Sequence, residues 1–140
     1  MPTNHIVSIL ARQSPFAIGT DELDREVFSV NFDLIVNHPW YSIEKTILNL
    51  LLSPSPSPLI TLNSDIFVGH QPELPSGDGP YTTLILTGGT GPEEAHSGER
   101  WDYLSFQLLV RAKDYMMACD KIVAEWNRLH GTRNQDVSYI

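Results

Sequence analysis

Apolar and polar residues alternate along three segments of the chain, and each alternation predicts a β-strand. In Trp101–Ala112 every even-numbered residue from Leu104 onward is apolar. Tyr81–Thr87 and Val27–Val36 show the same period of two, which is typical of a strand with one buried face. Further short strand candidates are residues 59–62, 65–68 and 137–140.

Two other segments repeat their apolar residues at helical spacing. The first predicts a helix of about ten residues after Ser42, whose hydroxyl suits an N-cap, with Glu44 at the positive end of the helix dipole. The second predicts a helix between Asp114 as N-cap and Gly131 as terminator. The stripe that this second helix is expected to bury consists of Tyr115, Cys119, Ile122, Trp126 and Leu129, widened by Met116 and Val123.

Together these elements predict one α+β domain, a mainly antiparallel β-sheet with two helices packed on one face. The chain has 140 residues, a length that supports one hydrophobic core. Residues 1–41 are interpreted as an N-terminal extension, with a candidate helix start at Thr20 or Asp21 and a candidate added strand, and residues 42–140 as the main domain. The SPSPSP segment at residues 53–58 is interpreted as a stiff surface connection, because its prolines lack backbone donors.

Composition and charge narrow the functional class. The apolar content of 41% and the charged content of 19% fit a soluble globular protein without a membrane span. The N-terminus does not resemble a signal peptide, so assembly in the cytoplasm is expected. Seventeen acidic residues against nine scattered basic ones give a net charge of −8. Because nucleic-acid binding needs clustered Lys and Arg, the sequence argues against a dedicated binder but not against a protein that lets DNA pass.

Residues for covalent catalysis are scarce. Cys119 is the only cysteine, which excludes an internal disulfide and a multi-cysteine zinc site. Its mostly apolar neighbours favour a buried thiol over a catalytic one. No G-x-S-x-G motif occurs. The histidines outside the acidic segment described next are isolated from one another: His5, His38, His70 and His130.

The segment Gly88–Arg100 carries the most unusual chemistry and is predicted to be a loop between two strands. Its glycines begin like a phosphate-binding loop, but acids follow instead of a lysine and a hydroxyl, and no helix starts there. One imidazole and four carboxylates form a candidate metal-ligand set: Glu93, Glu94, His96, Glu99 and Asp102. They lack the fixed spacing of ligands held on a helix, so a solvated acidic loop is preferred and the metal site remains an alternative.

Two segments of the chain resemble the minor capsid or tail-terminator proteins of long-tailed bacteriophages. They are DIFVGHQPELP at Asp65–Pro75 and LTGGTGPEEAHSGERWDYLSFQLLVRAKDYMMACDKIVAEWNRLHG at Leu86–Gly131. The resemblance lies in the order of the elements: a short helix, a D-I-F-x-G-x-x-P segment, a strand ending in T-G-G, a loop with proline and acids, a Q-x-x-V-R strand, and a helix ending in L-H-G. It covers roughly residues 42–131 and makes this region a tail-terminator-like domain.

The resemblance implies a structural virion protein of the phage neck or tail that is not an enzyme and takes no cofactor. Such proteins form a ring, commonly a homohexamer, at the head-proximal end of the tail tube. The ring ends tube polymerisation and joins the tail tube protein to a head-completion or stopper protein. DNA passes through it without specific binding, and no membrane partner is expected. A neck or head-completion connector is the nearest alternative. A metal-dependent module and an adaptor that binds a partner through residues 1–58 are the others.

Under this interpretation the acidic segment is expected to contact a neighbouring subunit or the adjoining ring. The segment is long and rich in Gly, Pro and Glu, and it contains no assembled catalytic group. This is expected for a loop that carries an interface. The expected interface residues are Gly88, Gly89, Gly91, Pro92, Glu93, Glu94, His96, Glu99, Arg100 and Trp101.

Overall fold

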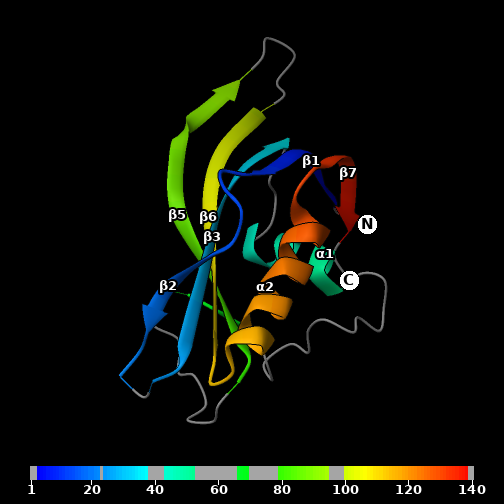
Figure 1. Ribbon diagram of the computed structural model, residues 1–140. Coiled ribbons are helices and arrows are strands. Elements are labelled where there is room, and N and C mark those ends of the chain that lie inside the picture. The colour runs from blue at the N-terminus through cyan, green and yellow to red at the C-terminus, as the bar shows by residue number, and fades with distance from the viewer. Residues whose placement is uncertain are drawn as a thin grey trace.

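The computed structural model describes residues 3–22, 24–37, 43–52, 66–69, 79–94 and 100–138. Within them the chain forms one curled β-sheet with two helices on one face, so the predicted α+β class is confirmed (Figure 1). In chain order the elements are β1 (Thr3–Ala11), β2 (Phe16–Thr20), β3 (Glu26–Asn37), α1 (Ile43–Leu52), β4 (Ile66–Val68), β5 (Tyr81–Glu94), β6 (Arg100–Ala112), α2 (Tyr115–Leu129) and β7 (Thr132–Ser138).

Strands β3 and β6 form the centre of the sheet, whose strand order is β4-β5-β6-β3-β1-β7. They pair along the whole of β3, from Glu26 opposite Ala112 to Asn37 opposite Trp101. The other edge of β3 pairs with β1 along one half and with β2 along the other. All these pairs are antiparallel, and the short pair β4–β5 is parallel. The predicted strand at residues 27–36 is therefore present and occupies a central position.

The core lies between the sheet and the helices, because alternate residues of β3 and β6 point towards α1 and α2. Phe32 and Phe106 are opposite each other in the strand register, and their rings stack with centroids 4.8 Å apart. Both side chains are fully buried. The cluster also draws on β1, β5 and both helices, so a single core holds the described elements together.

Both predicted helices are present. α1 has the predicted length of ten residues, while its expected cap Ser42 lies outside the described residues. α2 begins after Asp114, whose carboxylate accepts the backbone N–H groups of Met116 and Met117 at 2.8 and 3.1 Å. It ends before Gly131, which has a φ of +85° and so leaves helical geometry at little cost.

The N-terminal part differs from the prediction at residues 20–26, where a turn joins β2 to β3 and no helix starts at the residues that the structure describes. The Asp21 carboxylate accepts the backbone N–H of Arg25 at 2.9 Å and its Nε–H at 2.8 Å. Asp24 has a φ of +57°, which tightens the reversal. Asp21 thus closes a hairpin where capping a helix was expected. The strand expected at residues 59–62 and the SPSPSP segment lie outside the described residues, and the expected C-terminal strand begins earlier, at Thr132.

Candidate functional site

Residues 88–94 and Arg100 belong to two paired strands, so the prediction of a loop over Gly88–Arg100 was wrong for these residues, while residues 95–99 lie outside the described residues. β5 continues to Glu94 and β6 starts at Arg100, with Glu94 opposite Arg100 and Glu93 opposite Trp101. Two register shifts, between Leu86 and Gly88 and between Thr90 and Glu93, absorb residues that would otherwise end the pairing. Sequence reasoning took the glycines and the proline as strand terminators. His96 and Glu99 lie outside the described residues.

Gly89 allows two strands to approach each other closely. Gly89 has a φ of +152°, and a Cβ atom there would come within 2.1 Å of the carbonyl oxygen of Tyr103 on β6. Beside it, Thr87 Oγ1 donates a hydrogen bond to Ser105 Oγ at 3.1 Å across the first register shift. The T-G-G sequence therefore lies within the strand pairing of the hairpin.

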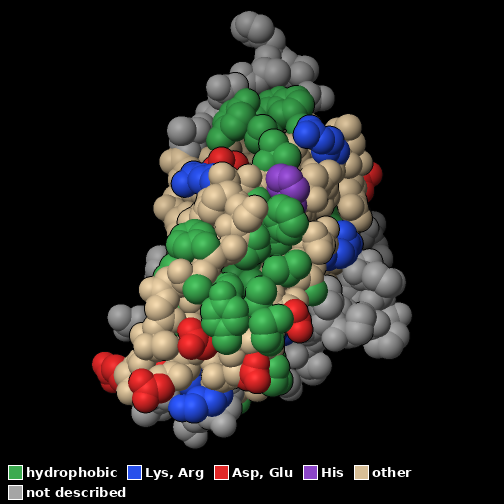
Figure 2. Space-filling view, viewed as in Figure 1, with side chains coloured by type: hydrophobic (Ala, Val, Ile, Leu, Met, Phe, Trp, Pro, Cys, Tyr) green, Lys and Arg blue, Asp and Glu red, His purple; other side chains and the backbone are tan. Residues whose placement is uncertain are grey.

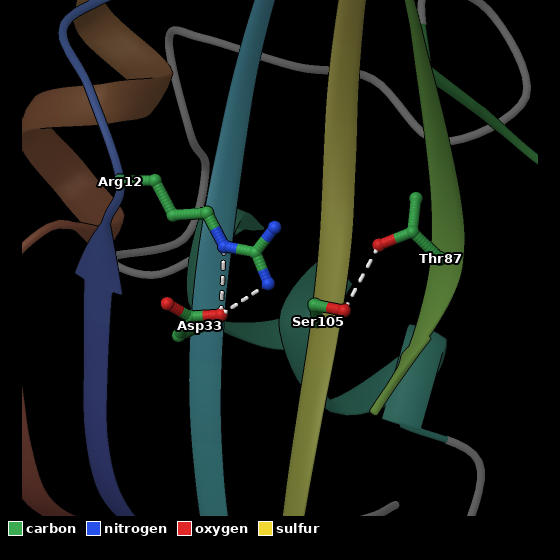
Figure 3. A network of polar contacts seen from close by, with 4 residues as sticks. All are labelled: Arg12, Asp33, Thr87 and Ser105. Atoms are coloured by element: carbon green, nitrogen blue, oxygen red, sulfur yellow. Dashed lines mark hydrogen bonds and ion pairs between the residues drawn. The ribbon is translucent and has the colours of Figure 1, made fainter. Parts of the chain in front are cut away.

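Polar side chains form a row across the sheet face opposite the helices (Figure 3). Asp33 Oδ1 accepts hydrogen bonds from Arg12 Nε at 2.9 Å and from Nη2 at 2.7 Å. These bonds, and then the charge of Asp33, raise the pKa of Arg12 above its ordinary value. Thr87 and Ser105 continue the row on β5 and β6. Side chains of neighbouring strands thus tie this face together.

Helix α2 is rotated about its axis relative to the predicted orientation. The residues that it buries are Ala118, Lys121, Ile122, Glu125 and Leu129. Cys119 and Trp126 are only half-buried, so Cys119 is not the fully buried thiol that was expected. The remaining members of the predicted stripe are exposed: Tyr115, Met116 and Val123. The apolar pattern therefore located the helix correctly but assigned three of its side chains to the wrong environment.

The inward side of α2 also holds a buried polar cluster that sequence reasoning missed. The fully buried carboxylate of Glu125 accepts the Thr82 hydroxyl of β5, with its two oxygens at 2.8 and 3.0 Å. Lys121 Nζ lies 3.9 Å from Glu125 Oε2, one helical turn away. Two ionisable residues at i and i+4 usually indicate an exposed helix face, so no local signal marked this pair as internal.

A second ionic group ties the β2–β3 turn to β6. Arg111 Nε lies 3.7 Å from Asp21 Oδ2, the oxygen that also accepts from Arg25. Burial, and then repulsion from Arg25, lower the pKa of Arg111. Its guanidinium also lies 6.0 Å from the centroid of the Tyr81 ring. Together these contacts link the β2–β3 turn to β6 and β5 at one end of the sheet.

The described residues contain no group of three or more His, Cys, Asp or Glu side chains placed to hold a metal ion. The predicted metal-ligand set is not tested by them, because His96 and Glu99 lie outside the described residues and so do the side chains of Glu93 and Glu94. Neither described helix is long and apolar enough to cross a membrane. The arrangement within the described residues is one of strand-to-strand and helix-to-strand contacts.

Comparisons of the chain with protein-family models, with curated proteins and with solved structures found no match.

Proposed function

We propose that this protein is a structural subunit of a long-tailed bacteriophage, and that it forms a ring at the head-proximal end of the tail tube. The ring ends tube polymerisation and joins the tail to a head-completion protein. The ordered set of motifs in residues 65–75 and 86–131 supports the proposal. Within the described residues, the elements that hold these motifs follow one another as α1, β4, β5, β6 and α2, although β5 continues beyond T-G-G to Glu94.

The observation that carries the proposal is the β5–β6 hairpin. Its strands have 14 and 13 residues, far longer than the five to six residues of a typical strand. β4 pairs with β5 only as far as Leu84, so in the described part of the chain the outer edge of β5 has no strand partner beyond that residue. Figure 1 shows the hairpin rising to one end of the molecule.

The sequence of the hairpin favours packing of its surface against a neighbour over pairing of its edge with a strand of that neighbour. Pro92 lacks a backbone donor, and the two register shifts disturb the regular edge that strand addition requires. A subunit with such an edge can meet a neighbour without open-ended sheet growth. This is the behaviour that a closed ring requires.

The charge distribution supports passage of DNA without binding. The net charge is −8. The ion pairs of Arg12 with Asp33 and of Arg25 with Asp21 set a carboxylate beside each of these cations. A carboxylate beside a guanidinium reduces its attraction for phosphate, so weak and non-specific duplex binding is expected.

Negative-stain images together with the mass from light scattering test the proposal on the intact protein. The expected result is rings of one size. Deleting Glu93 and Glu94 together with their cross-strand partners Arg100 and Trp101 shortens the hairpin by two residue pairs and should leave a folded monomer. Arg133→Ala, on β7 at the opposite edge of the sheet, is the matched control and should form normal rings.

Each outcome has one meaning. A monomeric wild-type protein contradicts ring formation, and normal rings from the shortened variant contradict the role of the hairpin. Addition of the wild-type rings to a polymerising tail tube protein of the same phage then tests the place of the ring. Capped tubes of limited length are expected, whereas unlimited growth would instead indicate a connector elsewhere in the neck.

A further inference from the structure

Helix α2 carries two overlapping stripes that could face the sheet, and Ile122 and Leu129 belong to both. The other main members of the stripe predicted from the apolar spacing are large: Tyr115, Cys119 and Trp126. The other members of the stripe that α2 buries are small or ionisable: Ala118, Lys121 and Glu125. The centres of the two stripes lie roughly 60° apart around the helix axis, since successive residues are about 100° apart.

Hydrophobic burial alone favours the predicted stripe. Two aromatic side chains and a thiol remove far more apolar surface from water than one alanine does. Burial of a lysine and a glutamate costs free energy unless their charges are compensated. Yet Glu125 is fully buried and Lys121 is exposed to only 8%. Figure 2 shows apolar side chains gathered over α2 on the molecular surface. The hydrophobicity of the helix therefore does not select the observed rotation.

The buried polar cluster supplies contacts that depend on the rotation of α2. Thr82 Oγ1 of β5 lies 3.0 and 2.8 Å from the two carboxylate oxygens of Glu125, and Thr82 is itself fully buried. Lys121 Nζ lies 3.9 Å from Glu125 Oε2. Side-chain tips lie about 5–6 Å from a helix axis, so a turn of roughly 60° would displace the carboxylate by about 5 Å. The hydrogen bonds to Thr82 would then be broken.

We propose that Thr82, Lys121 and Glu125 form a polar lock that sets the rotation of α2 on the sheet. The lock thereby decides which side chains of α2 face solvent, and it keeps Met116 and Val123 outside. Buried polar groups can select one arrangement of a helix even where they add little stability. The lock belongs to the single chain, so it does not depend on the proposed ring.

Two side chains on opposite flanks of the buried stripe report the rotation of α2 in the intact protein. Cys119 is half-buried and is the only cysteine of the chain, so the rate of maleimide labelling measures its accessibility. Labelling of Lys121 by an N-hydroxysuccinimide ester is followed by peptide mass spectrometry. A turn of α2 towards the predicted stripe buries the thiol and exposes the amine. The two rates should then change in opposite directions.

The variant Thr82→Val/Glu125→Gln removes the hydroxyl donor and the negative charge while it retains the sizes of both side chains. Labelling of Cys119 should slow, and labelling of Lys121 should accelerate, each roughly tenfold, because the locked rotation becomes a minor state of about 10%. Thr83→Val is the matched control. Thr83 is the next residue of β5 and is also buried, but its side chain points to the opposite face of the sheet. Both rates should remain at the wild-type values in the control.

Other outcomes overturn the lock. Wild-type rates for both labels in the double variant would show that steric fit alone sets the rotation. Faster labelling of both residues would show a loosened domain, in which the cluster contributes only stability. If circular dichroism shows that the double variant does not fold, Thr82→Val alone decides, because it retains a β-branched residue in the strand. It must show the same opposite changes at lower amplitude. A monomeric wild-type protein would contradict the proposed ring and leave the lock standing.

Discussion

The side of α2 that faces the sheet contains a lysine and a glutamate, whereas part of the side that faces away contains methionines and a valine. On the inward side the Glu125 carboxylate accepts the Thr82 hydroxyl, and Lys121 lies beside it. On the outward side Met116 and Val123 are exposed. A buried ion pair adds little stability, and exposed methionines add none to a monomer. The comparison shows that α2 buries an ionisable pair and exposes apolar side chains, the reverse of the usual arrangement in a helix.

Removing one member of the buried pair should cause the largest loss of stability. Glu125→Leu takes away the carboxylate beside buried Lys121, and Lys121→Met leaves the Glu125 carboxylate without its cation. Each single variant should lower the free energy of unfolding by about 3–5 kcal/mol, measured in urea. The triple variant Glu125→Leu/Lys121→Met/Thr82→Val should recover most of the loss, because all three side chains of the cluster are then apolar. Full stability of either single variant would show that the cluster is not buried as described.

Two adjacent residues sharpen the comparison between the sides of α2. Ile122 is fully buried and Val123 is 36% exposed. Ile122→Ala should cost about 3 kcal/mol because it leaves a cavity, whereas Val123→Ala should change monomer stability by less than about 0.5 kcal/mol. Chemical denaturation below the association concentration measures both. Equal losses at the two positions would contradict the observed rotation of the helix.

Removal of the helix cap should cause the smallest loss of stability, and it should affect both sides of α2 equally. Asp114→Ala removes the carboxylate that accepts the N–H groups of Met116 and Met117. The expected loss is about 1 kcal/mol of unfolding free energy. Asp114→Ser, which retains an acceptor, should restore most of it. If alanine and serine were equally destabilising, the cap would not be the cause.

The sequence was sufficient wherever a short-range pattern determines structure. The alternation in residues 101–112 corresponds to β6, and the Asp114 cap and Gly131 terminator define α2. Such signals succeed because they depend on neighbouring residues only. The antiparallel sheet with helices on one face followed from them.

Long-range contacts account for what the sequence did not reveal. Glycines and a proline in residues 88–92 suggested a loop, but bulges and the close approach of Gly89 to Tyr103 keep the strands paired. Lys121 and Glu125 suggested an exposed helix face, whereas both are buried and Thr82 of β5 donates a hydrogen bond to Glu125. The interface role of the hairpin remains a prediction.

Native mass spectrometry of the intact protein over a range of concentrations tests the central claim most directly. A subunit of the proposed ring should give one closed oligomer, expected to be a hexamer, and should give no larger series at higher concentration. A monomer at every concentration, or a series of ever larger oligomers, would contradict the account.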